Sequence, residues 1–448
     1  MADRNVKIQT PPGMRDFYPD DMRLQRWLFD AWRNVSEAFG FEEYEGPIFE
    51  YLDLYTIKSG EGIVSELFNF EDRGGRRFAI RPEMTPTLAR MVAAKANALP
   101  KPLKWYSIPR MCRAERPQKG RLREFFQWNV DVLGTDDPLA DAEVIAVAAD
   151  LFRRIDVGPE HVEIRWSDRR LAAAVLRDLK LADELHADAF AMIDRVDKLP
   201  AEAFDEAWDQ KFGTVVAGRE VRDMLTNCTL DDALKRVGNE TGGENLEKSA
   251  GRSLSENLAQ LQTHLESLGV ADYCRFDLKI VRGLAYYTGV VFEAYPKSVA
   301  SRALLGGGRY DNLTGLMGGP AVPGVGFGAG DAPLFEFLKE IDRLPTSSRS
   351  LDVFLIDSRE EFFADVLALA ARLRAANIAA DFSYKRQAVG KQMKQADSRG
   401  AKYVIVFGDE YREAKQVQIR SLETGTTSVQ NLEEFLAKPG WTLGRAIS

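Results

Sequence analysis

Apolar residues near the start of the chain recur with the spacing of a helix. They are Leu24, Leu28, Ala31, Val35 and Ala38, and Gly40 follows them as a stop signal. Strand-like runs come next. Residues 166–265 consist of short segments rich in alanine, leucine and charge, interrupted by the polar stretch 238–251. This pattern predicts an amphipathic helix, then strands, then a mostly helical insertion with a loop inside it.

Strand-like signals return at residues 276–294, and a glycine-rich region follows them. The polar, proline-marked segment 342–350 has the composition of a linker. Beyond the linker, strand-like segments alternate with helical ones, at residues 351–356, 360–375, 379–384, 389–399, 402–409 and 416–422. This alternation predicts a separate, small α/β unit.

The stretch REFFQWNVDVLG, residues 123–134, alternates as a strand. One face would carry Phe125, Gln127, Asn129 and Asp131, and the other Phe126, Trp128, Val130 and Val132. An aromatic ring, two amides and a carboxylate on one face favour a surface that binds a ligand. The alternative is the solvent-exposed face of an antiparallel sheet. In FAIRPEMTP, residues 78–86, Arg81, Glu83 and Thr85 would share a face if a strand continued through Pro82, although proline implies a strand edge or end.

Composition narrows the class of protein. The 448 residues are 45% hydrophobic with a net charge of -8, and no stretch approaches eighteen consecutive apolar residues. The first ten residues lack the apolar core of a signal peptide, so we expect a soluble, cytoplasmic protein. The three cysteines and three histidines are scattered, which argues against disulfides and structural zinc.

Basic residues form two clusters, at 113–123 and 384–402. The net charge of -8 argues against nucleic-acid binding over the whole surface of the protein, yet a local basic surface can still attract phosphates. Either cluster alone is typical of a solvated loop or helix face.

Several motifs together resemble the histidyl-tRNA synthetase family of class II aminoacyl-tRNA synthetases. They are PPGMRDFYP at 11–19, RPEMTP at 81–86, FFQWNVD at 125–131, VRGLAYYTG at 281–289 and GGGRYDNL at 306–313. The resemblance implies an α+β fold, in which helices flank an antiparallel catalytic sheet, with a helical insertion, a C-terminal α/β anticodon-binding domain and a homodimer. The implied boundaries are 1–165 and 266–341 for the catalytic core, 166–265 for the insertion and 350–448 for the anticodon-binding domain.

The implied reaction joins histidine to histidine tRNA. The histidine carboxylate attacks the α-phosphorus of ATP, which gives histidyl-adenylate and pyrophosphate, and the 3′ end of the tRNA then takes the acyl group. Because the first nucleophile is already ionised, that step needs positive charge and alignment more than a base. By resemblance, Arg113 and Arg282 supply both. Mg²⁺ is expected to arrive with ATP, without a dedicated metal site on the protein.

The resemblance also assigns binding residues by position. The residues implied to bind histidine are Glu83, Thr85, Gln127, Asp131, Tyr286, Tyr287, Gly307 and Tyr310. Those implied to bind ATP are Arg113, Glu115, Arg121, Phe125 and Gly328. Those expected to contact tRNA are Arg116, Lys119, Lys385, Arg386, Lys391 and Lys394.

The chain departs from the family pattern at three positions. Ala285 stands where the family usually has an acidic residue, and Asp131 where it often has glutamate. In GVGFGAGDAPL, residues 324–334, the expected strand leads into a helix, but Pro333 stands where class II enzymes place an arginine for adenine and the γ-phosphate. Gly326, Gly328 and Gly330 would form the floor of the ATP site, and we expect Arg121 to carry more of the γ-phosphate charge.

Three alternatives remain at the level of sequence. A synthetase-like regulatory subunit of ATP phosphoribosyltransferase has a similar core, but it lacks the C-terminal domain. An RNA-binding module could use the two basic clusters, but it leaves the polar-faced strand and the tyrosine pair unexplained. A class II synthetase for glycine, proline or threonine is opposed by VRGLAYYTG.

Overall fold

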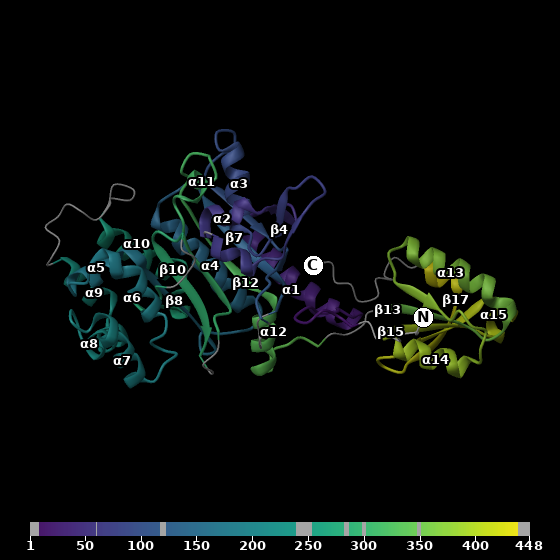
Figure 1. The fold of residues 1–448 in the computed structure, drawn as a ribbon. Coiled ribbons are helices and arrows are strands. Elements are labelled where there is room, and N and C mark those ends of the chain that lie inside the picture. Colours follow the sequence, from purple (N-terminus) through teal and green to yellow (C-terminus); the bar gives the residue numbers. More distant parts are fainter. Residues whose placement is uncertain are drawn as a thin grey trace, which may run out of the picture. The chain divides into compact units, whose positions relative to one another are not determined.

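The computed structural model describes residues 9–59, 61–116, 122–238, 253–281, 286–297, 302–346 and 351–437. The chain divides into two compact units, residues 1–344 and 345–448, and each is described here by itself (Figure 1).

A mixed, mainly antiparallel sheet forms the centre of the N-terminal unit. Within the described residues it has nine strands, in the order β1 (Glu42–Glu43), β5 (Leu103–Ser107), β7 (Glu124–Leu133), β12 (Gly324–Gly330), β11 (Leu305–Arg309), β10 (Val290–Pro296), β8 (Val162–Asp168) and β9 (Cys274–Phe276), with β6 (Arg110–Cys112) paired to β7. The outer pairs β1–β5 and β8–β9 are parallel, and the pairs between β5 and β8 are antiparallel. The predicted strand at residues 124–133 therefore lies inside the sheet.

Helices cover the apolar face of this sheet. They are α1 (Pro19–Ala38), α4 (Pro138–Arg154), α10 (Leu254–Ser267) and α12 (Asp331–Glu340). Trp32 of α1 stacks on Trp128 of β7, with ring centroids 6.0 Å apart, and both rings are fully buried. The predicted helix at the start of the chain is confirmed, and Gly40 beyond it has the positive φ of 75° that favours glycine.

A smaller sheet lies beside the main one and orders its strands β2 (Phe49–Tyr51), β4 (Arg77–Ile80) and β3 (Asn69–Glu71). The helical elements between and after these strands are α2 (Asp53–Ser59), η1 (Glu61–Glu66) and α3 (Thr85–Lys95). Two further short elements are η3 (Ala271–Tyr273), which precedes β9, and α11 (Leu313–Leu316), which follows β11. Strand β4 ends at Ile80, because Pro82 has no N–H to continue the ladder. The strand end that Pro82 implies is confirmed, and Arg81, Glu83 and Thr85 do not share a strand face. Arg81 is buried and donates to the carbonyls of Gly46 and Arg110, at 2.9 and 3.0 Å.

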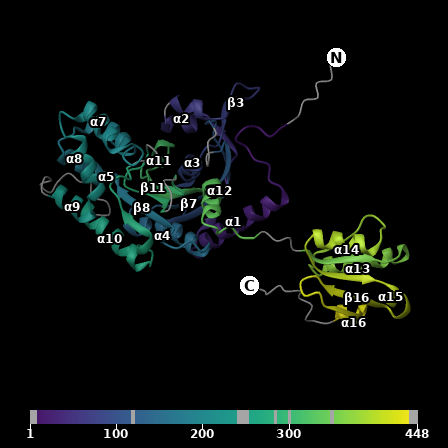
Figure 2. The ribbon, with the colours of Figure 1, turned by 90° about the horizontal axis from the view of Figure 1, so that it is seen from below.

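Short helices form a group at the β8 side of the sheet, as Figures 1 and 2 show. They are α5 (Arg169–Asp178), η2 (Asp183–Leu185), α6 (His186–Ile193), α7 (Ala201–Phe212), α8 (Gly218–Asn227) and α9 (Leu230–Gly238). Phe204, Trp208 and Phe212 of α7 are buried at helical spacing and pack their rings together. The group follows directly from strand β8, where Asp168 caps α5 by accepting from the backbone N–H of Arg170.

The C-terminal unit is a five-stranded sheet covered on both faces. Its strands are β14 (Ala380–Phe382), β13 (Leu351–Asp357), β15 (Ala401–Phe407), β16 (Gln416–Ser421) and β17 (Thr427–Asn431), and its helices are η4 (Glu360–Phe362), α13 (Phe363–Ala375), α14 (Val389–Ser398), α15 (Asp409–Ala414) and α16 (Leu432–Ala437). Val353 and Leu355 pack in the cluster beneath α13, whereas Phe354 and Ile356 pack in the cluster beneath α14. The predicted α/β unit is confirmed, and the alternation along β13 explains its two-sided core.

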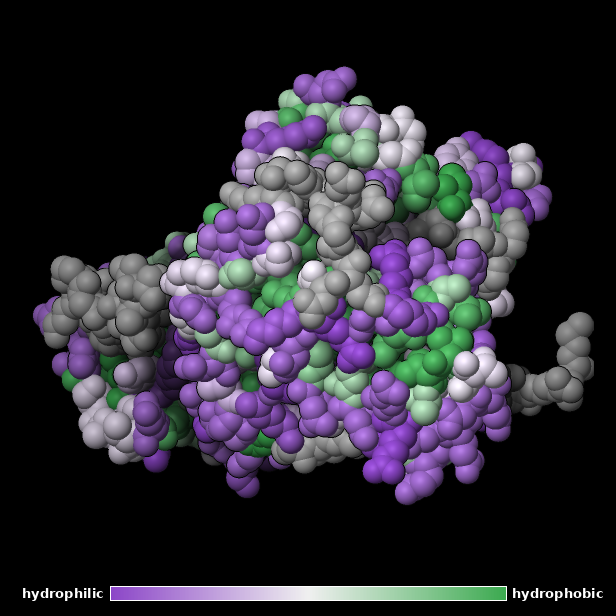
Figure 3. Space-filling model, turned by 90° about the vertical axis from the view of Figure 1, so that its left-hand side faces the viewer, coloured by the Kyte–Doolittle hydropathy of each residue, from purple (hydrophilic) through white to green (hydrophobic). Residues whose placement is uncertain are grey.

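None of the described helices is long and apolar enough to cross a membrane. Figure 3 shows one face of the protein, on which hydrophilic residues predominate and hydrophobic ones form separate patches.

Candidate active site

A cavity of about 690 Å³ opens over strands β7, β11 and β12. Its described lining includes Arg113, Phe125, Gln127, Gly306, Gly328 and Gly330 along the sheet, and Lys198, Glu293, Tyr295 and Arg302 on the other walls. The segment around Lys198 follows α6, and its neighbour Asp197 pairs with Lys279 at 2.9 Å, which ties the segment to the core. The polar face of β7 predicted from sequence therefore borders a cavity of the size that ligands occupy.

The arginine-rich loop between β6 and β7 is fixed at its base. The backbone N–H of Arg113 donates to the carbonyl of Arg123 at 2.8 Å, and the Arg123 side chain donates to the carbonyl of Glu115 at 3.1 Å. Arg113 donates through Nε to the carbonyl of Pro82 at 3.0 Å, and its guanidinium lies over the ring of Phe125, 5.2 Å from the centroid. A permanent positive charge is thus held at the cavity beside an aromatic wall.

Glycines of β12 make room for the polar side chains of β7. A Cβ at Gly326 would lie 2.0 Å from the Asp131 carboxylate, and one at Gly328 would lie 2.8 Å from the Gln127 amide. Gly328 and Gly330 line the cavity, as expected for a floor. The expectation for Gly326 needs correction, because the space above it is filled by Asp131.

Asp131 lies in a buried cluster of polar side chains, on the same face of β7 as Gln127 of the cavity lining. The Tyr310 hydroxyl donates to its carboxylate at 2.6 Å. Burial raises the pKa of Asp131 to about 7, and the hydrogen bond from Tyr310 lowers it by less. A carboxylate held this way can accept a hydrogen bond from a neutral ligand that brings its own N–H donor.

The tyrosine pair belongs to the same buried cluster. The Tyr286 hydroxyl donates to Glu83 at 3.3 Å, and its ring lies 5.2 Å from Tyr287 and 5.9 Å from Tyr310, centroid to centroid. Burial, with the charge of Glu83 second, raises the pKa of both Tyr286 and Tyr287, so both hydroxyls stay protonated. Thr85, the first residue of α3, lies within hydrogen-bonding range of Tyr286.

Sequence analysis did not predict two hydroxyl groups of this buried polar cluster, those of Ser107 and Tyr44. Ser107 follows Trp105 on β5 at the two-residue spacing that returns to the same face, and it pairs with Asn129 in the sheet. Burial, followed by the charge of Asp131, raises the pKa of Tyr44 well above its ordinary value. No sequence motif marks either residue, because β1 pairs with β5 across sixty-three residues of sequence and β5 pairs with β7 across twenty-six more.

The glycines of β11 face in alternate directions. A Cβ at Gly307 would lie 2.6 Å from the ring of Phe292 and 2.6 Å from Phe327, both in the core. A Cβ at Gly308 would instead lie 3.1 Å from Tyr287. Of these two glycines, Gly308 is therefore the one that faces the tyrosines, since side-chain directions alternate along a strand, and histidine binding at Gly307 stays a prediction.

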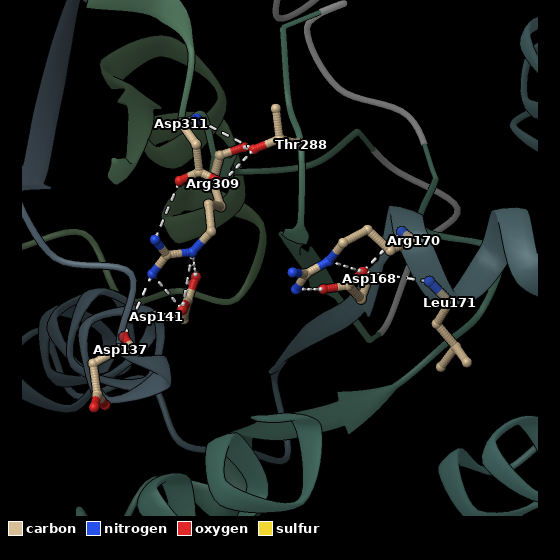
Figure 4. A network of polar contacts seen from close by, with 8 residues as sticks. All are labelled: Asp137, Asp141, Asp168, Arg170, Leu171, Thr288, Arg309 and Asp311. Carbon is tan, nitrogen blue, oxygen red and sulfur yellow. Dashed lines mark hydrogen bonds and ion pairs between the residues drawn. The ribbon is translucent and has the colours of Figure 1, made fainter. Parts of the chain in front are cut away.

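The arginine of GGGRYDNL has a role in packing that sequence analysis missed. Arg309 is buried and donates to the Asp141 carboxylate of α4, with Nη2–Oδ2 at 2.6 Å and Nε–Oδ1 at 3.0 Å. Figure 4 shows this pair. The Nη1 of Arg309 also donates to the carbonyl of Thr135 at 3.1 Å. Figure 4 shows a neighbouring pair, in which Arg170 donates to Asp168 at 2.7 Å. Arg309 thus holds α4 against β11.

A second buried ion pair fixes the start of α12. Asp331 accepts from Arg15, of the opening motif, at 2.7 Å and from the backbone N–H of Phe126 at 3.1 Å. Burial raises the pKa of Asp331, while Arg15 and the Phe126 N–H lower it. These contacts join the opening motif, β7 and α12 at one end of the cavity.

Three predicted residues, Arg121, Arg282 and Lys119, lie outside the described residues. Arg116 is exposed at the edge of that loop. Within the described parts of the chain, no cluster of three or more His, Cys, Asp and Glu side chains is placed to hold a metal ion.

The basic cluster of the C-terminal unit is divided by its contacts. Lys385, Lys391 and Lys394 are exposed. Arg386 instead pairs with Asp357 at 2.8 Å, and its guanidinium lies 3.4 Å from the centroid of the Phe363 ring. A tRNA contact for Arg386 stays a prediction, and its contacts with Asp357 and Phe363 also give this arginine a role in packing.

Comparisons with known proteins decide the family. A family model described as histidyl-tRNA synthetase matches residues 13–330, and one described as an anticodon binding domain matches residues 351–438. The chain belongs to the histidyl-tRNA synthetase family. The recognised resemblance and the α+β fold class are confirmed.

Relatives of this histidyl-tRNA synthetase family member span nearly its whole length. It is 39% identical over 427 residues to the histidine–tRNA ligase of Opitutus terrae, covering 94% of this chain and 95% of that protein. It is 33% identical over 422 residues to the chloroplastic/mitochondrial histidine–tRNA ligase of Arabidopsis thaliana, covering 94% and 85%. The crystal structure of histidyl-tRNA synthetase from Nostoc sp. PCC 7120 has the same fold, with a TM-score of 0.81 at 24% identity over 96% of this chain and 98% of that one. The predicted enzyme, a histidine–tRNA ligase, is confirmed over the regulatory-subunit alternative.

Asp131 gives a pH-dependent prediction about stability. Its pKa rises from 3.8 in the unfolded chain to about 7 in the fold, so its stabilising effect is full below pH 3.8 and is lost as the pH rises through 7. Asp131→Asn, which cannot ionise, should therefore gain stability over the wild type by about 1.4 kcal/mol per pH unit between pH 5 and 7. Urea unfolding at pH 5, 6, 7 and 8 measures this gain. A difference that is the same at all four pH values would contradict the burial of a charge at Asp131.

Proposed function

We propose that this chain activates histidine with ATP and transfers it to histidine tRNA through the polar cluster and the cavity described above. The observation that carries the proposal is their adjacency. Asp131 and Tyr286 belong to the polar cluster, which we propose takes the histidine ring, and Gln127, on the same face of β7, lines the cavity together with Arg113 and Phe125. An amino acid and a nucleotide could thus meet beside one arginine, as the reaction requires.

Histidine would be recognised by its ring and by its ammonium group. Asp131 accepts from the ring N–H, and Tyr310 holds that carboxylate in place. Glu83, Thr85 and Gln127 take the α-ammonium group, with Tyr286 positioning Glu83. Because Asp131 is buried, an analogue that lacks the ring N–H donor would leave the Asp131 carboxylate desolvated and unpaired. Such an analogue would therefore be rejected strongly.

ATP would occupy the cavity with adenine on Phe125 and its ribose and phosphates along Gly328. Arg113 lies where it can bridge the histidine carboxylate and the α-phosphate, and its forked donors suit both groups. Arg282, Glu115 and Arg121 are proposed to complete this site. Mg²⁺ enters with ATP and neutralises part of the phosphate charge.

The tRNA would contact both units. In the C-terminal unit, Lys391 and Lys394 are exposed on one side of α14, whereas Gln392 and Ala396 are buried on the other. Tyr384, 80% exposed beside Lys385, offers a ring on which a base can stack. Arg116 and Lys119, on the loop after β6, are proposed to meet the acceptor end.

The three lysines give a test of tRNA binding. Replacing Lys385, Lys391 and Lys394 together by alanine should weaken tRNA binding and reduce the slope of log affinity against log salt by about 2, since each lost phosphate contact removes about 0.7–0.9. Filter binding at several salt concentrations measures both quantities. Arg372→Ala, on α13, is the control, because that arginine pairs with Glu433 at 2.7 Å. Equal slopes for the triple variant and the wild type would contradict the contact.

We also propose a homodimer in the cytoplasm. On the small sheet, Phe49, Tyr51 and Phe70 are 44%, 55% and 43% exposed and pack around Phe78, which leaves an aromatic face open to solvent. Such a face supports association with a second copy. A monomeric mass in sedimentation at micromolar concentration would contradict the dimer.

The reaction itself is tested by exchange of labelled pyrophosphate into ATP, with purified protein and Mg²⁺. The proposal expects exchange that requires histidine and that other amino acids do not support. Absence of histidine-dependent exchange would overturn it.

A further inference from the structure

The terminal phosphates of ATP would lie at the end of the cavity farthest from the buried tyrosines. Position 333, where the family pattern has an arginine, carries proline, and Pro333 itself lines the cavity. Among the described residues that line the cavity, the cations are Arg113, Lys198 and Arg302. Arg113 is already placed at the α-phosphate, so Lys198 and Arg302 are the candidates for the rest of the triphosphate.

Strand pairing places Arg302 and Pro333 at the same end of the β11–β12 pair. In this antiparallel ladder, Gly306 pairs with Gly328 and Leu305 pairs with Ala329. Arg302 lies three residues before Leu305, and Pro333 lies four residues after Ala329 at the start of α12, so both leave the sheet at this end. Arg302 and Pro333 both line the cavity, and Arg302 is exposed. The Arg302 side chain, just before β11, therefore borders the same cavity that a side chain at position 333 would border from α12.

Charge and chemistry favour Arg302 over Lys198. Lys198 and Arg302 are both exposed, so the chemistry of the two cations decides between them. A guanidinium is less strongly hydrated than an ammonium and offers forked donors that match two phosphate oxygens. The carboxylates of Asp194 and Glu293 also line the cavity, which raises the need for a cation at this end.

We propose that Arg302 binds the terminal phosphates of ATP and supplies the guanidinium that α12 lacks at Pro333. This inference rests on the proposed histidine activation. It differs from the sequence-based expectation for Arg121, because it assigns the charge to the residues just before β11, the strand that pairs with the glycine-rich segment.

The test compares KM for ATP and KM for histidine in the pyrophosphate exchange reaction. Arg302→Ala should raise KM for ATP by about ten- to a hundredfold, the range for one charge-assisted hydrogen-bonded contact, with KM for histidine unchanged. Adding Pro333→Arg to Arg302→Ala should restore most of the affinity, because the new side chain enters the same space. Arg343→Ala is the control, since Arg343 pairs with Asp156 at 2.7 Å and does not line the cavity.

Each other outcome overturns the inference. An unchanged KM for ATP in Arg302→Ala would contradict the contact between Arg302 and the phosphates of ATP. An equal rise in KM for ATP and KM for histidine would contradict it as well. A rise that Pro333→Arg fails to reverse removes the assignment to the space beside α12, and a larger rise in Lys198→Ala transfers the role to Lys198. If the wild type shows no histidine-dependent exchange, the proposed function fails first, and isothermal titration of ATP into wild type and Arg302→Ala still tests the phosphate contact.

Discussion

Replacing Arg113 by alanine is expected to lower kcat for histidine-dependent pyrophosphate exchange by about 100- to 1000-fold, as for the loss of one donor that stabilises charge in the transition state. Two anionic reactants, the histidine carboxylate and the α-phosphate, must approach each other for the bond to form. Arg113 is fixed for this task by its hydrogen bond to Pro82 and by the closed base of its loop. Steady-state kinetics at saturating ATP and histidine measure the loss, because kcat then reports the chemical step when that step is slow.

Arg110→Ala is the matched control for this prediction. Arg110 lies three residues earlier on β6, but its guanidinium pairs with Glu124 at 2.9 Å and lies over Phe126, outside the cavity lining. We expect its kcat to stay within about threefold of the wild type, as for an exposed ion pair. If Arg113→Ala and Arg110→Ala were equally active, Arg113 would not be the bridging arginine.

Replacing Arg309 by methionine is expected to lower the free energy of unfolding of the N-terminal unit by about 3–5 kcal/mol, because the change leaves the Asp141 carboxylate buried without its partner. The two side chains are each 3% exposed, and the pair spans 168 residues of sequence. Urea unfolding followed by tryptophan fluorescence measures the change. The same variant loses the bond to the Thr135 carbonyl.

The double variant Arg309→Met with Asp141→Leu separates the ion pair from its packing. Replacing both charges by apolar groups removes the uncompensated carboxylate, so the double variant should be more stable than Arg309→Met alone. If the two losses simply added, the pair would not interact as the structure indicates. Arg170 pairs with Asp168 beside Arg309 and Asp141. The free energy of unfolding of Arg170→Met therefore shows how much this neighbouring pair contributes to stability.

Much of the fold follows from short-range patterns. The alternation of residues 124–133 places Trp128 and Val130 in the core and Gln127 and Asp131 on the opposite face, because a strand repeats every two residues. The first helix and the C-terminal α/β unit follow from the same kind of periodicity. In these segments the buried face and the local pattern agree, so a single sequence is sufficient.

Other features depend on contacts between distant segments. Arg386 and Lys391 look alike in sequence, yet Asp357, twenty-nine residues from Arg386, engages only the arginine. Likewise, Gly326 makes room for Asp131 because β12 pairs with β7 in a register that brings the two residues together. Register between strands far apart in the chain is set by the whole sheet, so no local motif could show which glycine faces which side chain.

Charging of histidine tRNA tests the central claim most directly. Purified protein is incubated with ATP, Mg²⁺, labelled histidine and a histidine tRNA transcript, and label is counted on the tRNA. The proposed function predicts label that depends on ATP and is lost when the 3′-terminal ribose has been oxidised with periodate, because the acceptor hydroxyl groups are then gone. No label on the intact transcript, from protein that is folded and binds ATP, would contradict it.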